Sequence, residues 1–194
     1  PPHFWIEPGQ DQTLVCGSTH ALEQARRAGY DDSRLVLTTG MVIKPSFYGL
    51  PPIDRRQRRL DLGLDPDRPT GVVMFGGQGS RQMVRIARAL DDVQLLLMCG
   101  RNELLAEQCR RLPRSARHAV VGFTDEVAEV MRLADFFIGK PGPGCLSEAV
   151  HCGLPIVTFE NAWTLPQERY NAEWVREQGV GLVLRSARSV RAAV

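Results

Sequence analysis

The chain has 194 residues, of which 43% are hydrophobic and 24% are charged, and its formal net charge is +2 at pH 7. A total charge this small gives no argument for a nucleic-acid partner, and the lack of any run of about 18 apolar residues argues against a membrane-spanning helix. The length suits one hydrophobic core with a small appendage.

The first part of the chain is expected to hold a few short elements and then a linker. The pattern predicts a strand at 13–17, a helix at 19–28 and a strand at 34–38. Residues 40–52 contain three prolines and two glycines, which is typical of a connecting segment.

From residue 55 onward, helical and strand patterns alternate. The expected elements, in chain order, are a helix at 55–62, a strand at 71–75, a helix at 81–90, a strand at 94–99, a helix at 103–112, a strand at 119–121, a helix at 127–133, a strand at 136–138, a helix at 145–152, a strand at 155–159, a helix at 169–178 and a strand at 181–184. Such alternation predicts an α/β fold, a Rossmann-like parallel sheet with helices on both faces.

The turn between the strand at 136–138 and the helix at 145–152 carries the strongest functional signal. Gly142 and Gly144 remove side chains that would keep a ligand off the backbone, and the first N–H groups of the helix near Cys145 point into the gap. Glu148 can accept hydrogen bonds from two vicinal hydroxyls, as in a ribose. These features predict a nucleotide site, although a plain strand-to-helix connector has the same composition.

Three more loops follow expected strands and should emerge at the same edge of the sheet. The loop at 76–80 is glycine-rich, but its spacing fits neither a P-loop nor the dinucleotide fingerprint. Arg101 either joins the site or starts a solvated helix. Phe123, next to Gly122, either covers a base or packs as a hydrophobic staple.

The ordered set of motifs resembles the donor-binding half of glycosyltransferase family 28. It consists of Gly-Gly-Gln-Gly-Ser, Cys-Gly-Arg-Asn, Val-Gly-Phe-Thr-Asp-Glu-Val, Gly-Lys-Pro-Gly-Pro-Gly-Cys-Leu-Ser-Glu-Ala, Gly-Leu-Pro and Pro-Gln-Glu-Arg-Tyr-Asn. Within the family, the similarity is greatest to monogalactosyldiacylglycerol synthases and bacterial diacylglycerol glucosyltransferases, over about residues 35–185. The resemblance implies the GT-B architecture, two Rossmann-like domains with a cleft between them. Residues 1–49 would then be the tail of the N-terminal acceptor domain with the interdomain linker, and residues 50–194 the UDP-sugar donor-binding domain.

Carried over by position, the resemblance assigns a donor site. The uracil would lie against Gly122 and Phe123, the ribose on Glu148, and the hexose near Gln167 and Glu168. The full set of expected donor-binding residues is Gly76, Gly77, Gln78, Gly79, Ser80, Arg101, Gly122, Phe123, Lys140, Gly142, Pro143, Gly144, Cys145, Leu146, Glu148, Gln167 and Glu168.

The implied activity is transfer of a hexose, galactose or glucose, from UDP to a lipid acceptor such as diacylglycerol, with inversion. The general base is expected on the N-terminal domain of the same protein, so no catalytic residue is assigned here, and this fragment alone should turn over poorly. No cofactor is implied, since the UDP-sugar is the substrate. A non-catalytic nucleotide-sugar binding subunit that needs a partner, and a UDP-sugar epimerase, are the alternatives.

Cysteines and basic residues bear on the setting of the protein. The five cysteines are odd in number and lack metal-ligand spacing, so we expect no metal and a reducing cytosol. Cys145 is either a thiol of lowered pKa at a helix N-terminus or a small residue of the turn.

The basic run at 54–59 is either a stripe that contacts anionic headgroups or a solvated helix. A protein peripheral to the cytoplasmic face of a membrane fits the first reading.

Overall fold

The computed structural model describes residues 6–7, 9–41, 43–162 and 164–194, which form two compact units, Pro1–Ile43 and Lys44–Val194. In the first unit, β1 (Leu14–Cys16) pairs in parallel with β2 (Leu35–Leu37), and α1 (Thr19–Arg27) and the short 3₁₀ helix η1 (Asp32–Arg34) connect them. The assignment of residues 1–49 and 50–194 to an acceptor and a donor domain remains a prediction.

The second unit contains the alternating elements that the sequence predicts. Its helices are α2 (Arg55–Asp61), α3 (Gln82–Ala89), α4 (Glu103–Arg110), α5 (Val127–Arg132), α6 (Pro143–His151) and α7 (Pro166–Glu177), with 3₁₀ helices η2 (Pro45–Phe47) and η3 (Ala187–Ala192). Its strands are β3 (Thr70–Met74), β4 (Gln94–Gly100), β5 (His118–Gly122), β6 (Phe136–Gly139), β7 (Ile156–Phe159) and β8 (Gly181–Leu184).

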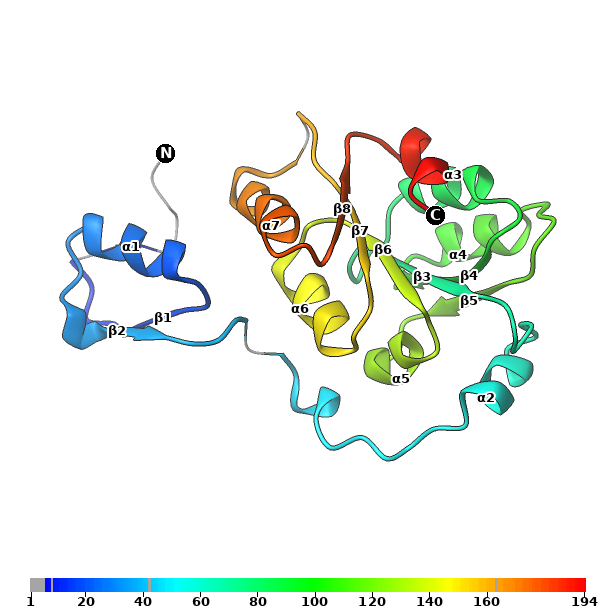
Figure 1. The fold of residues 1–194 in the computed structure, drawn as a ribbon, viewed down its shortest axis with the longest axis horizontal. Coiled ribbons are helices and arrows are strands. Elements are labelled where there is room, and N and C mark those ends of the chain that lie inside the picture. Colours follow the sequence, from blue (N-terminus) through cyan, green and yellow to red (C-terminus); the bar gives the residue numbers. More distant parts are fainter. Residues whose placement is uncertain (1–5, 8, 42, 163) are drawn as a thin grey trace. The chain divides into compact units, whose positions relative to one another are not determined.

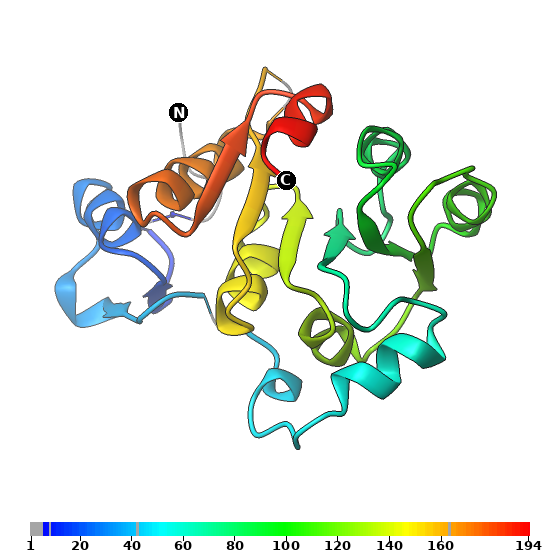
Figure 2. The ribbon, with the colours of Figure 1, turned by 45° about the vertical axis from the view of Figure 1, so that its right-hand side comes forward.

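The six strands of this unit form one parallel sheet in the order β5-β4-β3-β6-β7-β8. Helices α3 and α4 with η3 cover one face, and α5, α6 and α7 cover the other (Figures 1 and 2). The chirality of parallel crossovers requires this division, because the chain moves along the sheet in opposite directions in the two halves. The Rossmann-like parallel sheet with helices on both faces is thus confirmed.

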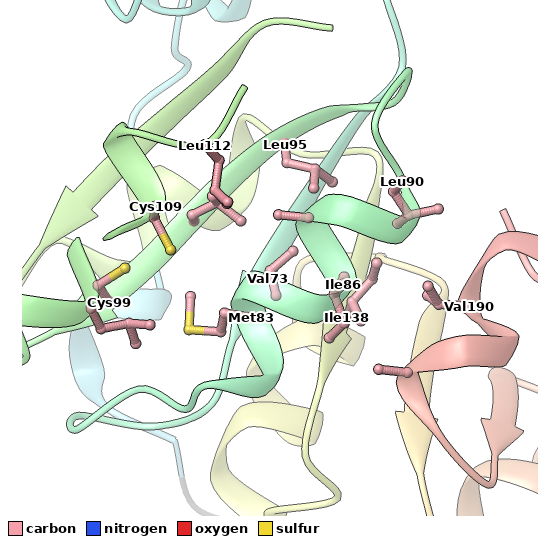
Figure 3. Close-up of a cluster of buried hydrophobic side chains, with 14 of the residues drawn as sticks. Val73, Met83, Ile86, Leu90, Leu95, Cys99, Cys109, Leu112, Ile138 and Val190 are labelled. Carbon is pink, nitrogen blue, oxygen red and sulfur yellow. The ribbon is translucent and has the colours of Figure 1, made fainter. Parts of the chain in front are cut away.

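The hydrophobic core lies between the sheet and the α3–α4 face. Strand residues such as Val73, Leu95 and Ile138 point toward Met83 and Ile86 of α3, and all of them are fully buried (Figure 3). Each such side chain contributes roughly 1.5–3 kcal/mol relative to an exposed one. Continuous apolar runs like β3 and β4 are typical of central parallel strands, which are covered on both sides.

The starts of two helices differ from the sequence-based expectation. Helix α6 begins at Pro143 rather than near Cys145, and α7 begins at Pro166 rather than at Arg169. In both, proline occupies the first helical turn, where its missing N–H costs nothing and its fixed φ suits the helix. Gly144, Gln167 and Glu168 therefore lie inside first helical turns.

Buried polar groups stabilise the amino edge of the sheet. The Arg59 guanidinium is buried and donates to the carbonyl of Leu133 and to Asp135 Oδ2, at 2.7 Å for the latter. Asp135 also accepts from the Thr70 backbone N–H at 2.8 Å and from Arg55 at 2.8 Å. This network joins α2 to the first residue of β3 and to the segment just before β6.

The other arginines of α2 are also paired within the unit. Arg56 bonds Asp67 at 2.5 Å, and Arg58 lies 3.5 Å from Glu129. The basic run at 54–59 therefore forms a helix whose arginines have acidic partners in the protein, and its contact with anionic headgroups stays a prediction. Within the described ranges, no helix is long and apolar enough to cross a membrane.

Candidate functional site

The strand order places a crevice between β3 and β6. From β3 the chain proceeds to β4 and β5 on one side, whereas from β6 it proceeds to β7 and β8 on the other. Loops that leave the carboxyl ends of such neighbouring strands diverge, and ligands of open α/β sheets bind at this switch point. The register pairs Met74, the end of β3, with Gly139, the end of β6.

The loop after β3 contacts the loop after β4. The Arg101 backbone N–H donates to the Gly77 carbonyl at 2.9 Å, and the Asn102 side chain donates to the Gln78 carbonyl at 3.1 Å. Gly100 has φ of +60°, and a Cβ there would overlap the Gly77 carbonyl. Glycine is thus required at 100 both by its backbone conformation and by the close approach of the two loops.

Arg101 extends this contact to the end of β5. Its guanidinium lies 3.9 Å from the centroid of the Phe123 ring, a cation–π arrangement. Asn102, not Arg101, caps α4, by accepting from the Leu105 N–H at 3.0 Å. Phe123 is 52% exposed, so its ring is an accessible surface beside Arg101 rather than a buried staple.

On the other side of the crevice, Lys140 and Glu168 form an ion pair, with Nζ 2.7 Å from Oε1. The Glu168 side chain is only 10% exposed and that of Lys140 is 40% exposed. A Cβ at Gly142 would lie 3.2 Å from Lys140 Cε and 3.6 Å from Glu168 Oε1, and one at Gly76 would lie 3.8 Å from the same Lys140 carbon. The turn after β6, the loop after β3 and the start of α7 therefore meet.

The turn before α6 is held from several sides. The Thr158 hydroxyl donates to the Gly139 carbonyl at 2.9 Å, and the Asn171 side chain of α7 donates to the Pro141 carbonyl at 2.9 Å. Because Pro143 is the first helical residue, the N–H groups of Gly144 and Cys145 lie in the first helical turn, where no carbonyl of the same helix can accept from them. Such N–H groups and the positive end of the helix dipole are the features that helix termini use to bind anions, so an anion site at this turn stays a prediction.

Glu148 and Cys145 of α6 have shifted acidities. Burial raises the pKa of the half-buried Glu148, against the opposing charge of Lys44. Burial also raises the pKa of the Cys145 thiol to about 11, with Glu148 adding to the shift and Lys140 opposing it. The alternative of a lowered thiol pKa at 145 is therefore wrong, because desolvation outweighs the charge of Lys140 and the backbone hydrogen bond that favour the thiolate.

Most of the residues expected at the donor site are brought to this one edge. Phe123 contacts Arg101, Arg101 bonds the loop at 76–80, this loop lies close to Lys140, and Lys140 pairs with Glu168. Pro143 and Gly144 are exposed, whereas Gly142 and Leu146 are buried. The Ser80 hydroxyl accepts a hydrogen bond from the Gln82 backbone N–H at 3.2 Å, at the start of α3. Gln167 is exposed and does not line the cavity described next.

A cavity of about 230 Å³ opens beside the Lys140–Glu168 pair. Its lining includes three polar residues that sequence reasoning missed, Gln82, Asn161 and Thr164. Gln82 lies two residues after the glycine-rich loop at 76–80 and Asn161 lies two residues after the end of β7, so their positions after β3 and β7 were the available signal.

Comparison with known proteins agrees with this geometry. The model of the glycosyltransferase family 28 C-terminal domain matches residues 72–191. Monogalactosyldiacylglycerol synthase 1, chloroplastic, of Arabidopsis thaliana is 32% identical over 186 residues, which are 90% of this chain and 34% of that protein. The spinach (Spinacia oleracea) enzyme is 32% identical over 191 residues, 92% of this chain and 36% of that protein. The chain thus spans about a third of the length of these relatives.

Solved structures show the same fold at low identity. The lipopolysaccharide glycosyltransferase WaaG superposes with a TM-score of 0.62 at 17% identity, over 97% of this chain and 54% of that one. Anabaena HepE in complex with UDP-glucose gives 0.60 at 18%, over 95% and 53%. Acinetobacter baumannii MurG gives 0.59 at 17%, over 93% and 55%. All are GT-B glycosyltransferases, and this chain has the fold of about half of each.

Proposed function

The chain belongs to glycosyltransferase family 28, and we propose that it carries the donor site of an enzyme that transfers a hexose from a UDP-sugar to a lipid acceptor. The observation that carries the proposal is the convergence of the loops after β3, β4, β5 and β6 at the switch point, all within the segment that matches the family. The relatives' names, which do not include a binding subunit or an epimerase, support transfer rather than either alternative.

The proposed donor lies along the carboxyl edge of the sheet. The uracil contacts Gly122 and the exposed ring of Phe123, and the ribose hydroxyls donate to the Glu148 carboxylate. The diphosphate accepts from the N–H groups of Gly144 and Cys145. The hexose extends toward Lys140, Gln167 and Glu168. The Glu168 side chain is buried.

The chemistry follows from what this edge offers to a leaving UDP. As the bond to C1 of the sugar breaks, negative charge grows on the β-phosphate, and fixed N–H donors with a helix terminus stabilise it without reorganisation. The acceptor hydroxyl attacks C1 from the opposite face, with inversion, while a general base removes its proton. That base belongs to the N-terminal half of the protein. No cofactor is part of this proposal.

The proposed acceptor is diacylglycerol-like, and the donor sugar is galactose or glucose. Support comes from the names of the relatives, which are galactolipid synthases. A lipid acceptor implies that the protein works on a membrane surface, and we propose a peripheral position on the cytoplasmic face. Since the arginines of α2 have internal partners, contact with anionic lipids is not attributed to them.

Calorimetric titration of the chain with UDP, UDP-glucose, UDP-galactose and NAD tests the donor class. UDP and at least one UDP-hexose should bind with a 1:1 stoichiometry, whereas NAD should not, because the loop at 76–80 lacks the dinucleotide fingerprint. Binding of NAD without binding of UDP would contradict the proposal. Glu148→Ala in the same titration separates specific ribose contacts from general attraction of the phosphates to the protein.

A further inference from the structure

The cavity beside the Lys140–Glu168 pair has the size of a single sugar ring. Its volume is about 230 Å³. Pockets for drug-sized ligands begin at about 300 Å³. The cavity is therefore too small for a nucleoside diphosphate, but it can hold the terminal sugar of one.

Its walls combine apolar rings with polar groups, as a sugar requires. The rings of Phe75 and Phe159 stack with their centroids 6.1 Å apart and line one side. Lys140 and Glu168, fixed by their ion pair, line another. A hexose has apolar C–H faces and a rim of hydroxyls, so it can contact both kinds of wall at once.

The polar side chains that line the cavity differ in how many hydrogen bonds they already make within the protein. Asn161 donates its backbone N–H to the Thr164 hydroxyl at 2.9 Å and its side-chain amide to the Arg185 carbonyl at 3.3 Å. Lys140 and Glu168 bond each other. Among the described residues of the lining, Gln82 has a side-chain amide whose donors and acceptor all lack a hydrogen bond within the protein.

The position of Gln82 is nevertheless well defined. It is the first residue of α3, it is half-buried, and its backbone N–H donates to the Ser80 hydroxyl at 3.2 Å. A carboxamide on a fixed helical position presents donors and an acceptor in one plane. Such a group can pair with a hydroxyl in one orientation and leave the other orientation unpaired, which is how buried polar groups discriminate between substrates.

We infer that Gln82 is a specificity-determining residue of the donor site, whose side-chain amide hydrogen-bonds hydroxyls of the hexosyl group in the cavity next to Lys140 and Glu168. This inference rests on the proposed function and adds to it a residue that discriminates between hexoses. Galactose and glucose differ in the orientation of one hydroxyl, so the amide contributes to the preference between them.

The test compares UDP with UDP-glucose and UDP-galactose in calorimetric titrations of the full chain. Gln82→Ala should weaken the preferred UDP-hexose about threefold to tenfold, the range of one ordinary hydrogen bond. The affinity for UDP should stay within about twofold, because UDP has no group in the cavity. Gln82→Glu, which keeps the size but loses the N–H donors, should show the same selective loss and change the ratio between the two hexoses.

Arg85→Ala is the matched control, since Arg85 is an exposed residue of the same helix that does not line the cavity. It should leave all three affinities unchanged. If the unaltered chain binds UDP-hexose but Gln82→Ala and Gln82→Glu keep the ratio of UDP-hexose to UDP affinity, the inference is overturned and the proposed function stands. If the unaltered chain binds neither UDP nor a UDP-hexose, both are overturned.

Discussion

The two ends of the strands in the main sheet differ in how far their polar groups are hydrogen-bonded within the protein. At the amino edge, Asp135 accepts from the buried Arg59 and from the Thr70 backbone N–H, and Arg59 also donates to the Leu133 carbonyl. At the carboxyl edge, glycines dominate, Phe123 is half-exposed, and Gln82 has an amide without a partner in the described part of the chain.

This difference separates stability from binding. Buried polar groups that are fully satisfied rigidify a fold, whereas accessible groups without a partner in the protein bond water and are available to a ligand. Substitutions at the amino edge should therefore change the free energy of unfolding and leave nucleotide affinity alone. Substitutions at the carboxyl edge should do the reverse.

The largest expected effect is on stability, from Arg59→Ala. Removing one member of a buried ion pair leaves its partner uncompensated, which costs about 3–5 kcal/mol. We expect about 3 kcal/mol, because Asp135 keeps Arg55 and its side chain is 36% exposed. Urea unfolding measures this loss, and the UDP affinity of the folded variant should equal that of the unaltered chain.

Arg56→Ala is the control for this substitution, since the Arg56–Asp67 pair is 64% and 70% exposed. Exposed pairs contribute at most about 1 kcal/mol. Equal destabilisation by the two substitutions would show that the amino-edge network does not stabilise the fold through burial.

Glu148→Gln should weaken UDP binding by about 1–3 kcal/mol through the loss of charge-assisted hydrogen bonds. Because burial raises the Glu148 pKa in the folded protein, its charged form opposes folding above that pKa, and acidification relieves the opposition. The variant should therefore keep or gain stability at pH 7, in contrast to Arg59→Ala.

The same shift gives a pH dependence. As pH falls through the raised pKa, which lies above the usual value of about 4.3, the carboxylate that accepts from the ribose is lost. The ratio of UDP affinity between the unaltered chain and Glu148→Gln should shrink on acidification, in calorimetric titrations at a series of pH values. A ratio that is independent of pH would remove Glu148 from the ribose contact.

The smallest effect, and the sharpest test of the diphosphate position, is expected from Gly144→Ala. A Cβ at Gly144 meets no atom within 4 Å outside its own helix, and the backbone there is not left-handed. Alanine is favoured over glycine in helices by up to about 1 kcal/mol, so thermal stability should be kept or raised. UDP affinity should fall severalfold, because the methyl group stands where a phosphate approaches the backbone. An unchanged affinity would place the anion elsewhere.

Sequence patterns predicted the elements of the main sheet well, because buried strands such as β4 are continuous apolar runs and the connecting helices have a clear period. They also located the glycine-rich loops that meet at the crevice. The starts of α6 and α7 were missed because the two helices were expected to begin after Pro143 and Pro166, although proline is common in the first helical turn.

Pairings between distant residues could not be predicted from the sequence. Lys140 and Glu168 lie 28 positions apart, and Arg59 and Asp135 lie 76 apart. No local pattern reports that a lysine and a glutamate share a cavity, or that arginines of a basic run have internal acidic partners. A charge run gives the number of charges, and the fold decides where their partners lie, so the two interpretations of the basic run at 54–59 could not be separated from the sequence.

Three consecutive residues before α6 are each hydrogen-bonded to a different residue elsewhere in the fold: Gly139 to Thr158, Lys140 to Glu168, and Pro141 to Asn171. The backbone of this segment is thus already ordered in the folded protein, before a ligand binds. A nucleotide that docks there immobilises little additional chain, so its association should carry a small loss of conformational entropy. Preorganisation of this kind also means that the empty and occupied forms should share one conformation between residues 139 and 142.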